Sequence, residues 1–82
     1  MFHKINDVMP LPDYRLSVRF SEGCTKIYDV KPLFDKIPSF AELKDGNRFE
    51  DVYVDVGGHG IAWNDRIDLS CEELWSNGVL EV

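Results

Sequence analysis

Eighty-two residues suffice for a single domain, residues 1–82, with one small hydrophobic core. With 44% hydrophobic and 29% charged residues, the composition is that of an ordinary folded domain and excludes a disordered chain. The net charge is −6 and the nine Lys and Arg residues are scattered singly, which argues against direct binding to nucleic acid.

Features of the chain also bear on its compartment. Cys24 and Cys71 have no spacing typical of a metal or redox site. His3, Lys4 and Asp7 interrupt the start of the chain, and no apolar run is long enough to cross a membrane. We therefore expect a cytoplasmic protein with reduced thiols and no membrane contact.

A mildly alternating pattern predicts a first strand over residues 5–11. Its inner, apolar face would carry Ile5, Met9 and Leu11, and the other face Asn6, Val8 and Pro10. Pro10 and Pro12 lack backbone donors, so this strand is expected at the edge of a sheet. An exposed edge of this kind invites self-association with a second copy of the chain.

Residues 14–20 give the clearest strand in the chain. Apolar residues alternate there with polar ones, which include Arg15 and Arg19, as in a strand with one buried and one solvated face. A turn at residues 21–23 and a return strand over residues 25–30 complete a predicted three-strand meander.

Two short helical segments are predicted next. Pro32 fits the first position of a helical turn, and Pro38 ends that turn. Residues 39–42, Ser-Phe-Ala-Glu, match a capping box for a second segment, with Leu43 on its inner face.

The last third of the chain predicts a hairpin. Alternation over residues 50–56 indicates a half-buried strand, and residues 61–63 resume an extended apolar run. Between them, Gly57, Gly58 and Gly60 supply the positive φ angles of a tight reversal.

A capped helix follows the hairpin. Ser70 and Glu73 are spaced as a capping box, in which each side chain bonds the backbone amide of the other residue. Residues 77–78, Asn-Gly, are expected to end the helix in a left-handed conformation. Residues 79–82 either fray or pair as an edge strand. The predicted fold is α+β, an antiparallel sheet of order β-β-β-(short α)-α-β-β-α with helices packed on one face.

These motifs resemble a known bacterial family, domain of unknown function 2442. The resemblance lies in Gly-Gly-His-Gly-Ile-Ala-Trp-Asn-Asp at residues 57–65, Ile-Asp-Leu-Ser at residues 67–70 and Glu-Leu-Trp at residues 73–75. It extends to the front of the chain, at residues 14–20 and 29–34. The resemblance therefore covers nearly the whole chain and concerns fold more than chemistry.

The resemblance implies a protein partner. Members of that family are often encoded beside a second small protein, and some are fused to a helix-turn-helix domain. Such gene pairs have been interpreted as toxin–antitoxin systems with this domain as the antitoxin. The implied mechanism is occlusion of a basic toxin, the neighbouring gene product, by an acidic face or a sheet edge.

Metal or catalytic chemistry has few candidates. His59 lies in the glycine turn, and with Asp55 and Asp65 it suggests a metal-dependent hydrolase as a weak alternative. The other imidazole is that of His3, which nothing in the sequence places nearby. Cys71, beside two glutamates, is expected to pack rather than react. We therefore predict no catalytic residue, no metal and no cofactor.

Five residues are candidates for binding a partner or ligand: Arg15, Arg19, Tyr53, His59 and Trp63. The arginines form a basic strand face that is either solvated or meets a carboxylate-rich partner. The aromatic residues either belong to the core or line an exposed patch on which a partner docks.

The leading interpretation is a small non-enzymatic protein-binding module of bacterial type, antitoxin-like in its pairing with a neighbouring protein. The alternative is a small-ligand sensor. Its pocket would lie between the sheet and the helix at residues 70–77, with Tyr53 and Trp63 at the mouth.

Overall fold

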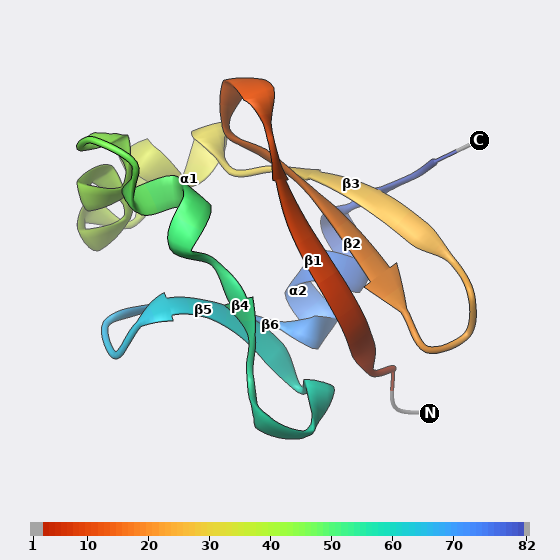
Figure 1. Cartoon of the computed structure of the whole chain (residues 1–82). Helices are drawn as coiled ribbons and strands as arrows, with labels where there is room; N and C mark the ends of the chain where they lie inside the picture. The colour runs from red at the N-terminus through yellow and green to blue at the C-terminus, as the bar shows by residue number, and fades with distance from the viewer. Residues whose placement is uncertain (1–2, 82) are drawn as a thin grey trace.

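The computed structural model describes residues 3–81. It has the predicted α+β fold, with antiparallel strands divided between two sheets (Figure 1). The first sheet has the order β1-β2-β3-β7, with bounds Ile5–Leu11, Arg15–Phe20, Thr25–Asp29 and Val79–Leu80. The second has the order β4-β5-β6, with bounds Tyr53–Val54, Gly60–Asn64 and Ile67–Ser70. The α-helices are α1, Lys31–Lys36, and α2, Cys71–Asn77. No helix within residues 3–81 has the length and apolarity needed to cross a membrane.

The predicted meander of β1, β2 and β3 is confirmed. Each strand pairs antiparallel with the next, and β1 lies at the edge of the sheet. Leu16, Val18 and Phe20 alternate along β2 and have no exposed surface, because this face of the strand meets the core. Arg15 and Arg19 lie on the opposite, solvated face of the same strand.

The inner face of β1 differs from the prediction. The pairing of β1 with β2 shifts register between Ile5 and Asp7, as in a β-bulge. After this shift Val8 packs against the core, and Met9, predicted to face inward, is 55% exposed. One extra residue has moved the later side chains to the other face of the sheet.

The helical segments after β3 are confirmed, but the capping box at Ser39 is wrong. α1 begins with Pro32 in its first turn and ends before Pro38. Pro38 also opens the 3-10 segment Pro38–Lys44, so the preceding residue, Ile37, is its N-cap and Ser39 lies inside it. No side chain caps this segment.

The predicted strand over residues 50–56 is mostly not a strand. Residues Arg48–Asp51 form a 3-10 segment, and only β4 pairs with β5. Val56 opens another 3-10 turn and is 90% exposed. Gly57 and Gly58 have φ angles of 81° and 74°, so the predicted reversal after the strand is confirmed.

Half of the capping box at α2 is confirmed. The Ser70 hydroxyl accepts a hydrogen bond from the Glu73 amide at 3.1 Å. The Glu73 carboxylate does not return this bond, because it accepts one from the Tyr28 hydroxyl at 2.8 Å. Gly78, which ends α2, has an extended conformation with φ −75° instead of a left-handed one. The tail then pairs with β3 as the edge strand β7, and Val82 lies outside the described residues.

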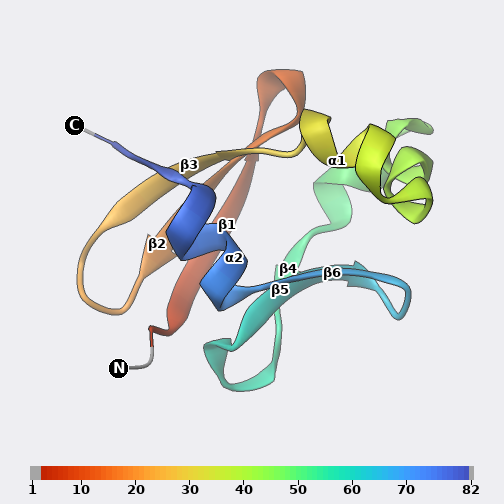
Figure 2. The ribbon, with the colours of Figure 1, turned by 180° about the vertical axis from the view of Figure 1, so that it is seen from behind.

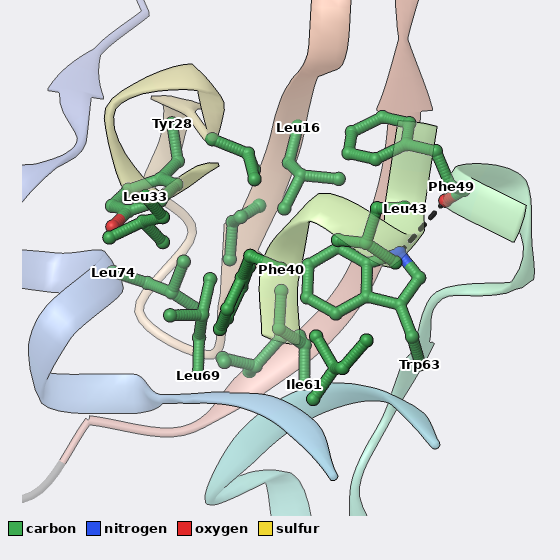
Figure 3. Close-up of a cluster of buried hydrophobic side chains, with 14 of the residues drawn as sticks. Leu16, Tyr28, Leu33, Phe40, Leu43, Phe49, Ile61, Trp63, Leu69 and Leu74 are labelled. Carbon is green, nitrogen blue, oxygen red and sulfur yellow. Dashed lines mark hydrogen bonds between the residues drawn. The ribbon is translucent and has the colours of Figure 1, made fainter. Parts of the chain in front are cut away.

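A shared core joins the two sheets. α2 contacts β3 of the first sheet and β5 and β6 of the second, and β1 contacts β4 (Figures 1 and 2). Leu16 from the first sheet lies in one cluster with Ile61 and Leu69 from the second (Figure 3). None of the buried residues described is polar or charged, so apolar packing supplies most of the stability.

Candidate binding groove

A groove of about 950 Å3 is lined by residues of β3, α1, β6 and α2, and Figure 2 shows how these four elements are arranged. Its floor is apolar. Tyr28, Leu33 and Leu69 line it and are only 4%, 8% and 7% exposed. Figure 3 shows these three side chains within the buried cluster. This volume lies near the upper end of the range for small-molecule sites, about 300–1,000 Å3.

The rim of the groove combines exposed apolar side chains with unpaired charges. Ile37 and Val79 line it and are 38% and 70% exposed. Arg15, Lys36 and Asp68 also line it, and none of them forms an ion pair with another residue among 3–81. The rim therefore offers charges of both signs beside an apolar floor.

One wall of the groove is fixed by the hydrogen bond between Tyr28 on β3 and Glu73 on α2. The phenol donates to the carboxylate at 2.8 Å. Burial, together with this carboxylate, raises the pKa of Tyr28 far above its ordinary value. The phenol therefore stays protonated at neutral pH and keeps α2 against β3.

A second cavity, of about 120 Å3, lies between the N-terminal end of the described chain and α2. It is lined by His3, His59, Ser70, Cys71 and Glu72. The structure thus brings the two imidazoles to one cavity, although they are 56 positions apart in the sequence. Nothing local in the sequence could have indicated this, because β1 and the glycine turn meet only in the folded chain.

This cavity does not assemble a metal site. Burial, followed by the nearby Glu22 and Glu72 charges, raises the pKa of the Cys71 thiol, which therefore stays protonated. The thiol donates to the His3 carbonyl oxygen at 3.1 Å. Residues 3–81 hold no group of three His, Cys, Asp or Glu side chains able to share a metal ion.

The residues of the metal-dependent hydrolase hypothesis lie apart. The Asp55 carboxylate accepts from the Val56 amide at 2.8 Å and so caps a turn. Asp65 lies beyond the far end of β5 from His59, and six residue steps of extended chain span roughly 20 Å. His59, Asp55 and Asp65 therefore cannot share one metal ion in this conformation.

The five predicted binding residues do not converge on one site. Arg15 lies at the groove, Arg19 on the outer face of β2, and His59 at the small cavity. Tyr53 is 48% exposed on the second sheet and lines neither the groove nor the small cavity. Trp63 is 6% exposed, and its indole N–H donates to the Phe49 carbonyl at 2.9 Å. This places Trp63 in the core and corrects its expected role in binding.

The pocket predicted beside the helix at residues 70–77 does exist, with different walls. The groove runs along α2, but neither Tyr53 nor Trp63 lines it. Sequence reasoning missed the residues that do, such as Lys36 and Asp68. The alternation Ile-Asp-Leu-Ser at residues 67–70 was a signal for β6, whereas no sequence signal pointed to Lys36.

Comparison with known proteins gives one informative structure. The chain is similar to the Putative DNA Binding Protein NE0471 from Nitrosomonas europaea, with 31% sequence identity and a TM-score of 0.70. The match covers 79% of this chain and 42% of that one, so this chain spans less than half of that protein's length. The curated proteins include no match.

This similarity corrects the expectation that nucleic acid is not a direct partner. A protein with the same fold and 31% identity is described as a putative DNA binding protein, although this chain carries a net charge of −6. The reason is physical. Net charge averages over a whole domain, whereas DNA contacts depend on a local cluster of basic groups or on another part of a longer chain. Charge alone therefore cannot exclude nucleic acid.

The family resemblance seen in the sequence is confirmed. The family described as "Protein of unknown function (DUF2442)" matches residues 5–79, from the start of β1 to the start of β7. Since this range includes both sheets, both helices and the groove between them, the chain belongs to that family.

Proposed function

We propose that the chain is a small binding module without catalytic activity of its own, and that its groove holds a segment of a partner protein. The observation that carries the proposal is the groove itself, about 950 Å3 with an apolar floor and unpaired charges at the rim. An apolar centre with a charged rim is the usual composition of a protein interface.

A protein segment suits this groove better than a small molecule. Ile37 and Val79 leave apolar surface exposed at the rim, where it gains from being covered by a partner. A small-ligand sensor is the alternative for the same groove. In that case a metabolite, rather than a peptide, would raise the melting temperature of the chain.

An antitoxin-like role is one form of this proposal. It draws on the family resemblance, and it makes the bound segment part of a toxin encoded beside this chain. The proposed compartment is the cytoplasm, because Cys24 and Cys71 are both free thiols. A toxin whose active surface includes the bound segment would be inhibited by occlusion.

The test is selection of peptides from a random displayed library, followed by titration of the selected peptides into two variants. Ile37→Asp places a charge on the apolar rim, and Val56→Asp makes the same change at a 90% exposed residue outside the groove. We expect Ile37→Asp to weaken binding about tenfold or more and Val56→Asp to leave it unchanged. A library that yields no binding peptide would contradict the proposal. An equal loss of peptide affinity in both variants would contradict it as well.

DNA binding is a second candidate function, favoured by the similarity to NE0471 at 31% identity. The test is a gel-shift titration of the chain with DNA from upstream of its own gene, at low and at physiological salt. This candidate predicts a retarded band that weakens steeply as salt rises, because bound phosphates release counterions. Unretarded DNA at low salt, where such contacts are strongest, would end it.

A further inference from the structure

The first sheet has one face in the core and one face that points away from it. α2 lies behind this sheet in Figure 1 and in front of it in Figure 2, and its Trp75 packs against Phe20 on the core face. The side chains of the other face, called the outer face here, neither belong to the buried cluster nor pack against it. Within residues 3–81 the outer face therefore has no covering layer.

The strand register arranges the outer face in three rows, because directly paired residues point to the same side of a sheet. The middle row contains Met9 on β1, Ser17 on β2, Ile27 on β3 and Val79 on β7. Met9 and Val79 are 55% and 70% exposed. An exposed and largely apolar row that crosses four strands is typical of a surface on which another protein surface packs.

The two flanking rows are charged. One contains Arg15 on β2 and its cross-strand partner Asp29 on β3. The other contains Arg19 on β2, between Asp7 on β1 and Thr25 on β3. Each flanking row carries charges of both signs, so the outer face can be complementary to a copy of itself.

Two-fold symmetry allows two ways of stacking this face on a second copy with the strands aligned and the middle rows in contact. With the axis along the strands, β2 lies over β3 of the other copy, and Arg15 meets the partner's Asp29. With the axis across the strands, the flanking rows exchange, and Arg15 meets the partner's Arg19. Opposite charges favour the first stacking, and like charges oppose the second.

We propose that the outer face of the first sheet is the interface of a homodimer whose two-fold axis runs along the strands, between β2 and β3. The contact of Arg15 with the partner's Asp29 forms twice beside the axis, where the twist of the sheets displaces facing side chains least. Met9 and Val79 cover each other at the two ends of the middle row. A dimer of this kind goes beyond the proposed function, because no other protein takes part in it.

The size of the face sets the expected affinity. Each copy contributes about ten residues, whereas a standard interface takes about 20–30 from each side. We therefore expect a weak dimer, with a Kd on the order of 10–100 μM. Sedimentation velocity of the full chain, without peptide, from about 5 to about 500 μM should show monomer giving way to dimer. A monomer at every concentration would overturn the proposal.

Met9→Asp tests the outer face without changing the groove, because Met9 does not line it. We expect this variant to raise the Kd of the dimer about tenfold or more. The matched control is Val56→Asp, which introduces the same charge at a 90% exposed residue outside both sheets. Equal weakening by the two variants would overturn the assignment of the interface to this face.

Charge reversal tests the direction of the axis. In the proposed stacking Arg15→Glu places a second carboxylate opposite the partner's Asp29 and weakens the dimer. If the axis instead ran across the strands, the same variant would meet the partner's Arg19 and tighten the dimer. A tighter dimer of Arg15→Glu would therefore overturn the proposed axis.

A mixture of two variants separates an interface contact from a general loss of structure. Asp29→Lys should weaken the dimer as Arg15→Glu does. In a mixed dimer the new glutamate faces the new lysine, while the native Arg15 and Asp29 face each other across the axis. We expect the equimolar mixture to dimerise about tenfold or more tightly than either variant alone. A mixture that behaves as the average of its two components would contradict the proposed contact.

One contact of the proposed stacking is unfavourable, and it supplies a test that does not depend on the fold of Asp29→Lys. Glu81 lies opposite Thr25, since its amide donates to the Thr25 carbonyl at 2.9 Å. Asp7 therefore faces the partner's Glu81. Asp7→Lys replaces this repulsion with attraction and should tighten the dimer at least about threefold. A dimer that is unchanged or weaker would count against the axis.

The dimer and the groove share part of their surface. Four residues of the outer face also line the groove: Arg15, Ile27, Asp29 and Val79. A peptide in contact with these side chains and a second copy would therefore exclude each other. A chain that binds library peptides but stays monomeric would overturn the dimer and leave the proposed function standing. A dimer that binds no peptide would do the reverse.

Discussion

At the residue scale, Trp63 joins the second sheet to the 3-10 segment Arg48–Asp51. Its indole is 6% exposed and donates to the Phe49 carbonyl at 2.9 Å. Trp63→Phe keeps an aromatic ring but leaves a buried carbonyl without its donor. We expect the free energy of unfolding to fall by about 1–3 kcal/mol, measured by urea denaturation.

The control is Tyr53→Phe, which removes a polar group from a residue that is 48% exposed. A surface change of this kind is expected to shift the unfolding free energy by no more than about 0.5 kcal/mol. Equal stability of Trp63→Phe and the unchanged chain would show that the indole hydrogen bond contributes nothing measurable.

The glycines show how far a single residue can be predicted from sequence. Gly57 and Gly58 were assigned to positive φ, and they have it. Gly60 was also predicted to have a positive φ, but a close contact explains this glycine instead. A Cβ at this position would lie 2.5 Å from the Leu69 carbonyl oxygen. Backbone conformation can be inferred from neighbours in sequence, whereas close approach depends on a strand that pairs later.

At the element scale, Glu42 links the 3-10 segment Pro38–Lys44 to its neighbours. Its carboxylate accepts from Arg66 at 2.9 Å and from Arg48 and Asn64 at 3.2 Å each. The hydrogen bond from Arg66 is the largest cause that lowers the pKa of Glu42. In the unfolded chain the Glu42 carboxyl keeps its ordinary pKa. The stabilisation that the charged carboxylate gives the folded chain is therefore fully present above that ordinary pKa, and it is lost as pH falls through the lower pKa of the folded chain.

We therefore expect Glu42→Gln to lower the melting temperature near neutral pH. We also expect the melting temperature of this variant to fall less on acidification than that of the unchanged chain. The two chains should converge in melting temperature as pH falls below the ordinary carboxyl range and through the lowered pKa of Glu42. The matched control is Glu50→Gln, an exposed residue without an ion pair among residues 3–81. A difference in melting temperature between Glu42→Gln and the unchanged chain that stays the same at every pH would contradict this account.

Elements were predictable where the pattern within one segment decided them. β2 has a complete alternation, and α2 has a cap that needs only Ser70 and Glu73. The strand predicted over residues 50–56 was longer than β4. Alternating valines fit any extended chain, whereas the pairing with β5 ends after Val54. The groove was only partly predictable, since its walls at residues 27–29 and 68–70 come from different sheets. Their meeting depends on packing, which no local pattern encodes.

At the scale of the whole molecule, the two sheets depend on one core. α2 contacts both sheets, and the buried cluster includes Leu16 of the first sheet and Ile61 of the second. Sheets of three or four short strands are marginal alone, so neither is expected to remain folded without the other. The last prediction is therefore a single cooperative unfolding transition.

Each sheet has its own natural probe for this prediction. Trp63 lies on β5, whereas the Trp75 ring packs 4.9 Å, centroid to centroid, from Phe20 of β2. Trp75→Phe and Trp63→Phe each leave one of the two tryptophans, so fluorescence of either variant follows one sheet during urea denaturation. In each variant we expect the fluorescence midpoint to coincide with the midpoint from far-ultraviolet circular dichroism.

Separate midpoints within the variant that retains Trp63 would contradict this cooperativity. They would mean that the second sheet, with Leu69 on β6, detaches from Leu33 and β3 while the first sheet persists. The groove would then be absent from the partly unfolded state, because its walls belong to both sheets. Coincident midpoints would instead tie the groove to the global fold. A peptide that fills the groove should then raise the fluorescence midpoint and the circular dichroism midpoint together. Once binding is saturated, this rise should be proportional to the logarithm of the peptide concentration.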